Sequence, residues 1–436
     1  MKKVLVLCAI FLLIVPAAYA LDMDSFTFGG HTRVRGYDMT NFWTFNDDQD
    51  FDNWSTFRHR TSLWTKVDTG YDVTGYVKIT NQNYGEGVTY EDAWEVDNES
   101  NKLFIDNAYI DINNLFDMPL ALRIGRQNVI YGTGFVLLDG QSQFASTSIY
   151  FDGLKLSADL GKNADVDFLY LKDQENNRDD GSDDDITLSG AYFTAKCPVI
   201  GGQQELYILN REDENLQKDI WMGGLRMSDK FECGLDYSGE FAYQIGDAFE
   251  AENGKDIDQE AYGYKLDLGY TLKDVAPTPR FFLGYSFLSG DEDDNDDESN
   301  RWDVFYGGWP QFGDQLVWKY VNIGPGNNIT NYDKDYNELS SVGGEAVYSN
   351  LSKATAGVGL SFTKKLNAKI SYSLLTVDEP DPGADDDFGD YYQLQAQYNY
   401  TDFLTFSLYA AAIEPGDAFN NDDTAHELFW ETKLTF

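Results

Sequence analysis

The chain has 436 residues, of which 74 are acidic and 32 are Lys or Arg, so its formal net charge is -42 at pH 7. Nucleic-acid binding requires a basic face, and this charge excludes it. The three cysteines are too few for a disulfide scaffold. Composition alone leaves open a secreted, acidic soluble protein.

Residues 1–20 have the pattern of a secretory signal peptide. Two lysines at positions 2 and 3 precede an apolar run over 4–15, and Ala-Tyr-Ala at 18–20 supplies a small-x-small cleavage site. We expect a mature chain of 21–436, in which no stretch approaches a membrane helix. A membrane protein without such a helix must be a closed barrel, because lipid leaves no other way to satisfy the backbone.

The first mature segments carry arginines at alternate positions. In 25–39, Arg33 and Arg35 share one parity while Phe26 and Phe28 have the other. In 57–67 the alternate residues Arg58, Arg60 and Lys66 repeat the pattern. Because an arginine at the lipid midplane costs about 2 to 4 kcal/mol, this parity must face the lumen.

Three further basic residues extend this set. Lys78 and Arg123 are predicted to face the lumen. Arg126 has the parity of Leu122 and Ile124, so it must lie above the apolar band or after a bulge, and we include it among the lumen candidates. The arginines could hold the wall rigid by pairing with lumen carboxylates, or contact a solute; the carboxylates considered are Asp68, Glu232, Asp236 and Glu240.

The segment 231–247, FECGLDYSGEFAYQIGD, alternates apolar and polar residues over its whole length. A period of two indicates one strand with an apolar and a polar face, and a tilted membrane-spanning strand needs only about 9 to 11 residues. Eighteen such segments follow one another, and sixteen is the alternative because their edges are soft. The sequence predicts an all-β fold: a single transmembrane antiparallel β-barrel with an even number of strands.

Connection lengths give the barrel a predicted orientation. With both termini periplasmic, alternate connections should be short turns, as at 68–72, 161–163, 197–202, 228–230, 274–278 and 364–367. The acidic blocks at 47–52, 173–185, 291–303 and 378–387 then all fall in long extracellular loops. The segment 290–350 is either an inward plug or an outward lid. Cys197 and Cys233 lie three strands apart in this order, too far to pair.

Several motifs resemble the alginate export family of Gram-negative outer-membrane barrels. They include FGGHTRVRGY at 28–37, LRIGRQNVIYG at 122–132, FDGLKL at 151–156, DYSGEFAYQIG at 236–246 and GYSFLSGD at 284–291, and the region 391–419 is also similar. The resemblance implies an outer-membrane channel for an anionic carbohydrate. The alternating C-terminal segment ending in Phe436 resembles the signal read by the barrel-assembly machinery, which we expect as a partner during biogenesis.

Catalytic and metal chemistry find little support. The only histidines, His31, His59 and His426, lack metal-ligand spacing and an evident nucleophile partner. We therefore expect no enzyme, no cofactor and no metal site. The Asp-rich loops lack the EF-hand pattern, which favours a solvated acidic surface, bridged by divalent ions to lipopolysaccharide, over a dedicated calcium site.

The leading functional hypothesis is a monomeric channel that passes an anionic carbohydrate or similar solute by passive conduction. Rings of basic side chains select anions, and the basic candidates would form such a constriction: Arg33, Arg35, Arg58, Arg60, Lys66, Lys78, Arg123 and Arg126. Lumen-parity acids make the wall mixed, so a general diffusion or nutrient-uptake porin is the alternative. A plugged structural or adhesive barrel is a third.

Overall fold

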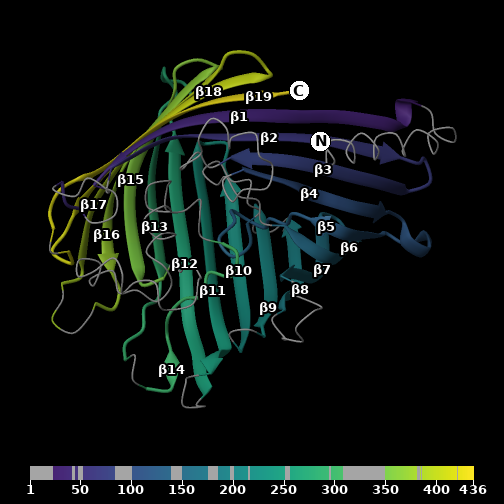
Figure 1. Cartoon of the computed structure of the whole chain (residues 1–436), viewed down its shortest axis with the longest axis horizontal. Helices are drawn as coiled ribbons and strands as arrows, with labels where there is room; N and C mark the ends of the chain where they lie inside the picture. The colour runs from purple at the N-terminus through teal and green to yellow at the C-terminus, as the bar shows by residue number, and fades with distance from the viewer. Residues whose placement is uncertain are drawn as a thin grey trace.

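A computed structural model shows one β-barrel, formed by strands between Phe26 and Thr435 (Figure 1). It describes residues 23–41, 45–47, 53–83, 101–138, 150–174, 185–196, 201–214, 217–250, 256–293, 296–307, 349–380, 383, 385–419 and 421–436. The expected signal peptide lies outside the described residues, as does Cys197.

The described residues contain nineteen strands and two short 3₁₀ turns, at Met23–Ser25 and Leu115–Asp117. The strands are β1 (Phe26–Thr40), β2 (Trp54–Asp68), β3 (Val73–Asn83), β4 (Asn101–Ile112), β5 (Leu120–Gln127), β6 (Phe151–Gly161), β7 (Ala164–Gln174), β8 (Ile186–Lys196), β9 (Gln203–Asp213), β10 (Lys218–Lys230), β11 (Leu235–Glu250), β12 (Asp256–Thr271), β13 (Arg280–Leu288), β14 (Glu298–Ser299), β15 (Leu351–Ser361), β16 (Leu366–Val377), β17 (Asp387–Asn399), β18 (Leu404–Pro415) and β19 (Ala425–Thr435).

Pairing of the first strand with the last closes the sheet. Each wall strand pairs antiparallel with the next along the chain, and β1 pairs with both β2 and β19. The two-residue β14 lies parallel beside β12, while β13 pairs directly with β15. With β14 outside the wall, eighteen strands close the barrel, which confirms the predicted fold class and strand number over the alternative of sixteen.

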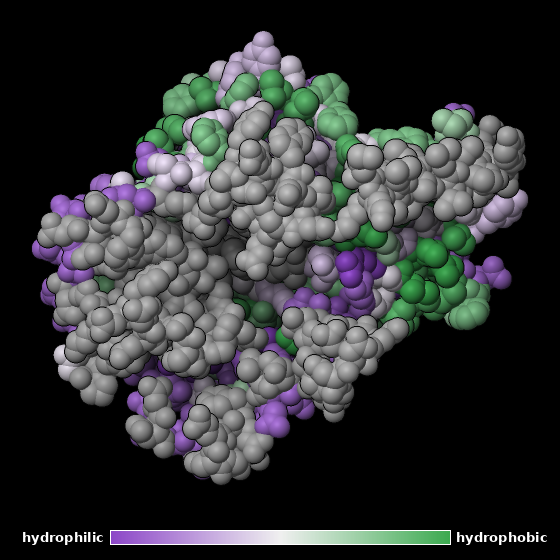
Figure 2. Space-filling model, viewed as in Figure 1, coloured by the Kyte–Doolittle hydropathy of each residue, from purple (hydrophilic) through white to green (hydrophobic). Residues whose placement is uncertain are grey.

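Alternation separates an apolar outer face from a polar inner face. Phe28, Phe57 and Leu63 are 58%, 65% and 56% exposed, whereas Arg35 and Arg58 of the same strands are buried at 1% and 4%. Figure 2 shows apolar surface around the rim where Figure 1 places β18, β19 and β5–β7. Among the described residues, no helix is long and apolar enough to cross a membrane.

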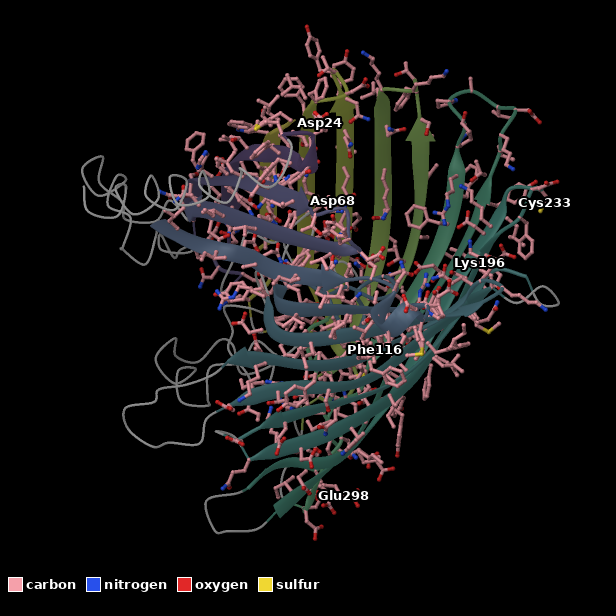
Figure 3. All side chains as sticks on the ribbon, turned by 90° about the vertical axis from the view of Figure 1, so that its right-hand side faces the viewer. Asp24, Asp68, Phe116, Lys196, Cys233 and Glu298 are labelled. Atoms are coloured by element: carbon pink, nitrogen blue, oxygen red, sulfur yellow. The ribbon has the colours of Figure 1, made fainter. Side chains whose placement is uncertain are left out.

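Short turns gather at the end of the barrel that carries the beginning of β1 and the end of β19. Thr69–Asp72, Lys162–Asn163 and the turn before Leu235 lie there, as the orientation predicts. Figure 3 labels Asp68, Lys196 and Cys233 at this end and Glu298 far from them. The acidic blocks, where they are described, fall in connections at the opposite end. We call the short-turn end periplasmic, following the predicted orientation.

The predicted boundary of the long strand was wrong at its start. β11 begins at Leu235, because residues 231–234 form the turn from β10. The amide of Phe231 donates to the carbonyl of Leu235, and Gly234 takes a positive φ of 99° that a residue with a side chain would rarely adopt. The alternation of apolar and polar residues continues across this turn, so the sequence does not reveal where the strand begins. The predicted turn at 228–230 lies within β10, and Cys233 is exposed.

In the part of the chain that the structure describes, two connections from the extracellular end fold into the barrel. β5 ends at Gln127, and the segment 128–138 that follows turns inward. Its Leu138 amide donates to the carbonyl of Tyr306 at 3.0 Å, and Phe135 lies 5.5 Å from the ring of Trp302. The described part of 290–350 that carries Trp302 and Tyr306 is therefore packed inside. Residues 308–348 lie outside the described residues.

The outer face supplies a test of the membrane boundary. Leu266→Arg, at an exposed outward position near the middle of β12, is expected to destabilise the barrel by about 2 to 4 kcal/mol, and Tyr270→Arg near the strand end by about 0 to 1 kcal/mol. Reversible unfolding in lipid vesicles measures both free energies. Equal effects at the two positions would contradict the placement of the apolar band.

Candidate functional site

Five buried cations on three neighbouring strands face the lumen, and we call them the basic wall: Arg33 and Arg35 of β1, Arg58 and Arg60 of β2, and Lys78 of β3. The register sets Arg33 directly opposite Arg60 and Arg35 directly opposite Arg58. Like charges at such positions repel. The wall is therefore stable only where carboxylates or aromatic rings compensate.

Two carboxylates from the neighbouring strands bind this wall. Glu431 of β19 lies 2.5 Å from Nε of Arg35 and 3.7 Å from Nε of Arg33. Asp106 of β4 lies 3.3 Å from Arg60 and 2.8 Å from Lys78, and it is fully buried. Buried carboxylates in such contact fix the positions of the cations.

Two of the four carboxylates considered from the sequence, Asp236 and Glu240, do not pair with the basic wall. Asp236 and Glu240 lie on β11, away from β1 to β3, and their ion pairs are with Arg280 and Arg226 instead. Cross-strand contact requires strands that are neighbours in the barrel, and β1 neighbours β19 only because the sheet closes. The alternation in the sequence identified the lumen-facing side of these strands, but it could not show which carboxylates lie beside which cations.

The basic wall is packed rather than open. Arg33 and Arg60 are 9% and 2% exposed, and the guanidinium of Arg35 lies 4.8 Å from the ring centroid of Phe429. Arg58 likewise lies over Tyr37 at 5.6 Å. Cations held against aromatic faces gain from the ring quadrupole. These cations would act on a passing solute mainly through their electrostatic field.

The remaining basic candidates occupy three different environments. Lys66 has lumen parity and is exposed near the periplasmic end of β2. Arg123 faces the lumen, 2.7 Å from Asp111 and 3.9 Å above the ring of Tyr109.

Arg126 does not belong to the lumen set. It shares the outward face of β5 with Ile124 and binds Asp152 of β6 through two hydrogen bonds of 2.9 and 2.6 Å. Its guanidinium also lies 4.2 Å from the ring of Tyr150. The position at the extracellular end of β5, with an acidic partner outside the barrel, makes the outward parity tolerable. Its inclusion among lumen residues was wrong.

Sequence reasoning missed a second group of lumen charges. Arg226 of β10 binds Glu205 of β9 at 2.5 Å and approaches Glu240 at 3.8 Å. Arg226 has the parity opposite to the exposed Trp221 and Leu225. The rule that found Arg33 would have found it too. Further lumen cations lie on β12 to β16, namely Lys265, Arg280, Lys353 and Lys369.

The loop 128–138 docks on the wall that carries Arg226. The ring of Tyr131 stacks on Tyr192 at 3.9 Å, and its hydroxyl donates to Asp167 at 2.6 Å. Gly132, with a positive φ of 56°, allows this approach, since an added Cβ would lie 2.9 Å from Cδ of Arg226. The Gly-Thr-Gly sequence at 132–134 therefore allows the loop to enter the barrel and pack against its inner wall.

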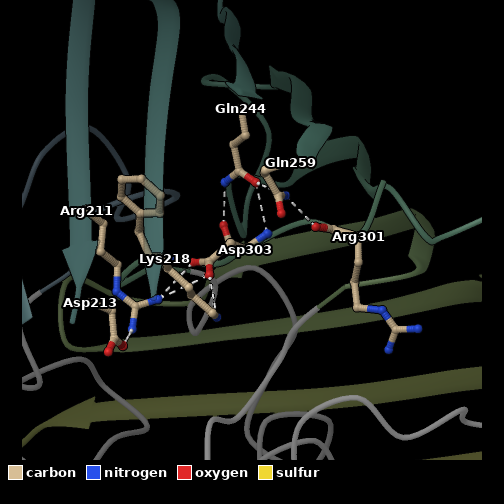
Figure 4. A network of polar contacts seen from close by, with 8 residues as sticks. Arg211, Asp213, Lys218, Gln244, Gln259, Arg301 and Asp303 are labelled. Atoms are coloured by element: carbon tan, nitrogen blue, oxygen red, sulfur yellow. Dashed lines mark hydrogen bonds and ion pairs between the residues drawn. The ribbon is translucent and has the colours of Figure 1, made fainter. Parts of the chain in front are cut away.

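Asp303 anchors the second inward segment (Figure 4). Its carboxylate lies 3.1 Å from Arg211 and 3.3 Å from Lys218, and its backbone amide donates to Gln244 at 2.9 Å. Burial alone would raise the pKa of Asp303, but the two cations and the amide of Phe305 outweigh it and lower the pKa to about 2. The ionised carboxylate therefore holds the segment to the wall at neutral pH.

Together these features describe a barrel whose inner surface is charged on several sides and narrowed by two loops. Among the described residues, no group of three or more His, Cys, Asp or Glu side chains could hold a metal ion. The arrangement suits recognition of a polar solute through fields and hydrogen bonds.

The architecture is that of outer-membrane porins. Over 94% of this chain it matches OprD from Pseudomonas aeruginosa, which is covered to 94% at 13% identity with a TM-score of 0.56. OccK2 (OpdF) of Pseudomonas aeruginosa, solved in complex with glucuronate, gives 0.55 at 13% identity, with 94% of this chain and 98% of that chain covered. A BenF-like porin from Pseudomonas fluorescens Pf-5 gives 0.56 at 11% identity, with 95% and 99% covered.

Sequence comparison identifies the family. The family model for alginate export matches residues 31–429, so the chain belongs to the alginate export family. No curated protein matches the sequence at a significant level.

The anchor at Asp303 supplies a test by pH. Because its pKa falls from 3.8 to about 2 on folding, its ion pairs stabilise the docked segment fully above pH 3.8 and lose that contribution as the pH falls towards 2. Asp303→Asn should remove the contribution at all pH values and raise amide hydrogen exchange at Phe305 at pH 7 by about tenfold or more, since breaking a buried ion pair costs about 3 to 5 kcal/mol.

Asp274→Asn, in an exposed periplasmic turn, is the matched control and should exchange like the native protein. Native exchange at Phe305 in the Asp303 variant would show that the ion pairs do not anchor this segment.

Proposed function

We propose that the protein is a monomeric channel of the Gram-negative outer membrane that passes an anionic carbohydrate or similar small anionic solute by passive conduction. The observation that carries the proposal is the basic wall, in which five lumen-facing cations occupy three adjacent strands. Membership of the alginate export family supports the same role. No cofactor is needed, since conduction requires only a wet path and a field that favours the solute.

The field of the basic wall would act over a distance rather than by direct contact. Its arginines are at most 9% exposed, so they are fixed and shielded from bulk water. In a cleft with low-dielectric walls, fixed charges of one sign raise the local concentration of the opposite ion. Weak attraction of this kind lets a solute enter and still leave.

The glucuronate bound in OccK2, a porin of similar fold, is an example of a carboxylated sugar held by such a barrel. For the present chain it suggests a probe. Glucuronate carries both the charge and the hydroxyl groups of the proposed solute class.

A general diffusion or nutrient-uptake porin is the second candidate. It is favoured by the carboxylates Glu205, Glu240 and Glu431, which share the lumen with the cations. A mixed wall of this kind would select only modestly. A plugged structural or adhesive barrel is favoured by the two loops that pair inside the barrel, and such a barrel would pass no solute.

We also propose the surroundings of the channel. The exposed apolar face would contact outer-membrane lipid and lipopolysaccharide. The alternating terminal strand β19 would be read by the barrel-assembly machinery during insertion.

Solute flux tests the basic wall. In proteoliposome swelling, the native protein should admit glucuronate faster than glucosamine, a cationic sugar of similar size. Replacing Arg33, Arg35, Arg58 and Arg60 together with Gln should lower the ratio of the two rates by about tenfold, equivalent to ~1.4 kcal/mol in the relative barrier.

Two controls separate charge from folding. The same four positions replaced with Lys keep the charge and should retain most of the native ratio. Arg126→Gln removes a charge from the outer face and should leave the ratio unchanged. A native ratio in the fourfold Gln variant would remove the basic wall from the selectivity mechanism.

A further inference from the structure

A pocket of 250 Å³ opens in the inner wall towards the periplasmic end, and Lys78 of the basic wall is one of its lining residues. Trp64 of β2, Tyr76 of β3 and Tyr109 of β4 line it, each within a few residues of the periplasmic end of its strand. Arg123 of β5 and Asn128 of the loop that follows complete one side. His31 of β1 and Asn107 of β4 also line it, so that β1 to β5 and this loop, six consecutive parts of the described chain, contribute to one site.

The aromatic residues of this pocket form a continuous stack. The rings of Trp64 and Tyr76 are 5.8 Å apart, those of Tyr76 and Tyr109 are 5.0 Å apart, and both pairs are nearly parallel. The guanidinium of Arg123 covers Tyr109 at 3.9 Å. Such contacts stabilise each member by dispersion and by the ring quadrupole. Because the ring faces cover one another, the polar edges are left to meet a solute.

Several of these edges carry hydrogen-bond donors that the described protein leaves unused. The hydroxyls of Tyr76 and Tyr109 and the indole N–H of Trp64 make no hydrogen bond to a described residue. The side-chain amide nitrogen of Asn128 is buried without an acceptor, although its oxygen accepts from Asn107. A buried donor without an acceptor costs free energy. A solute rich in acceptor oxygens would relieve it.

The charges around the pocket face it unequally. Lys78 and Arg123 line the cavity, whereas their partners Asp106 and Asp111 do not. Asp106 is fully buried behind the wall. The carboxylates hold both cations in place beside the pocket. A carboxylate in the pocket could therefore approach two cations without meeting an acid among its lining residues.

We propose that this pocket binds one carboxylate-bearing sugar ring, and so forms a solute-binding site on the periplasmic side of the basic wall. Its volume is below the roughly 300 to 1,000 Å³ of drug-sized sites, which suits a single ring. The stacked edges and Asn128 would donate to the ring oxygens, and Lys78 with Arg123 would hold the carboxylate. The inference rests on the proposed function and gives that channel a site of direct contact.

Calorimetric titration of the full-length protein in detergent with D-glucuronate tests the site. Tyr76→Phe combined with Tyr109→Phe keeps the ring stack but removes two donors, and should weaken binding by at least about tenfold. Tyr391→Phe with Tyr409→Phe is the matched control. These lumen tyrosines of β17 and β18 bond to each other, so binding should be unchanged.

Two further ligands separate the contribution of the carboxylate to binding from that of the sugar ring. Glucose lacks the carboxylate and acetate lacks the ring, and each should bind more weakly than glucuronate. Asn128→Ala lies outside the strands, so it tests the site without altering the barrel wall, and it should also weaken binding. Undetectable glucuronate binding by the native protein, native affinity in the Tyr76 and Tyr109 variant, or equal affinity for glucose would each overturn the proposal.

The proposed pocket and the proposed channel function can fail independently of each other. If the native protein admits glucuronate over glucosamine but the pocket variants bind glucuronate normally, only the pocket assignment fails. If that preference is absent, the proposed function fails whatever the pocket binds.

Discussion

Lipid offers no partner to a backbone amide or carbonyl, and this constraint shapes the whole protein. A sheet can satisfy it only by closing, and here the pairing of β1 with β19 removes both edges. Closure then gives every strand an outer and an inner face with a period of two. The same alternation that leaves Phe57 in lipid places Arg58 in the lumen. The charged interior follows from the closed backbone.

Closure also decides which charges can compensate one another. Arg35 faces Arg58 across one strand pair, and this repulsion is balanced by Glu431, which reaches Arg35 only because the last strand lies beside the first. On the far side of the basic wall, Asp106 holds Arg60 and Lys78. The cations are therefore fixed in place before any solute arrives. Preorganised charges act on a solute without the cost of rearranging.

Periodicity and charge predicted much of this fold. The alternation of apolar and polar residues predicts the eighteen strands and the end of the barrel at which the short turns lie. The cost of placing charge in lipid predicts that Arg33, Arg35, Arg58 and Arg60 face the lumen. The start of β11 was wrong because the turn at 231–234 continues the alternation, and Arg126 was misplaced because Asp152 and Tyr150 support it outside.

What could not be predicted depends on contacts between distant segments. Nothing local in 128–138 indicates that it packs on Tyr192 or pairs with Tyr306, and the pocket around Tyr76 needs six parts of the chain brought together by register. The most direct test of the account is the reversal potential of the native protein in a planar bilayer under a KCl gradient. The basic wall predicts discrete conductance steps with anion preference; steps with cation preference, or none from folded protein, would contradict it.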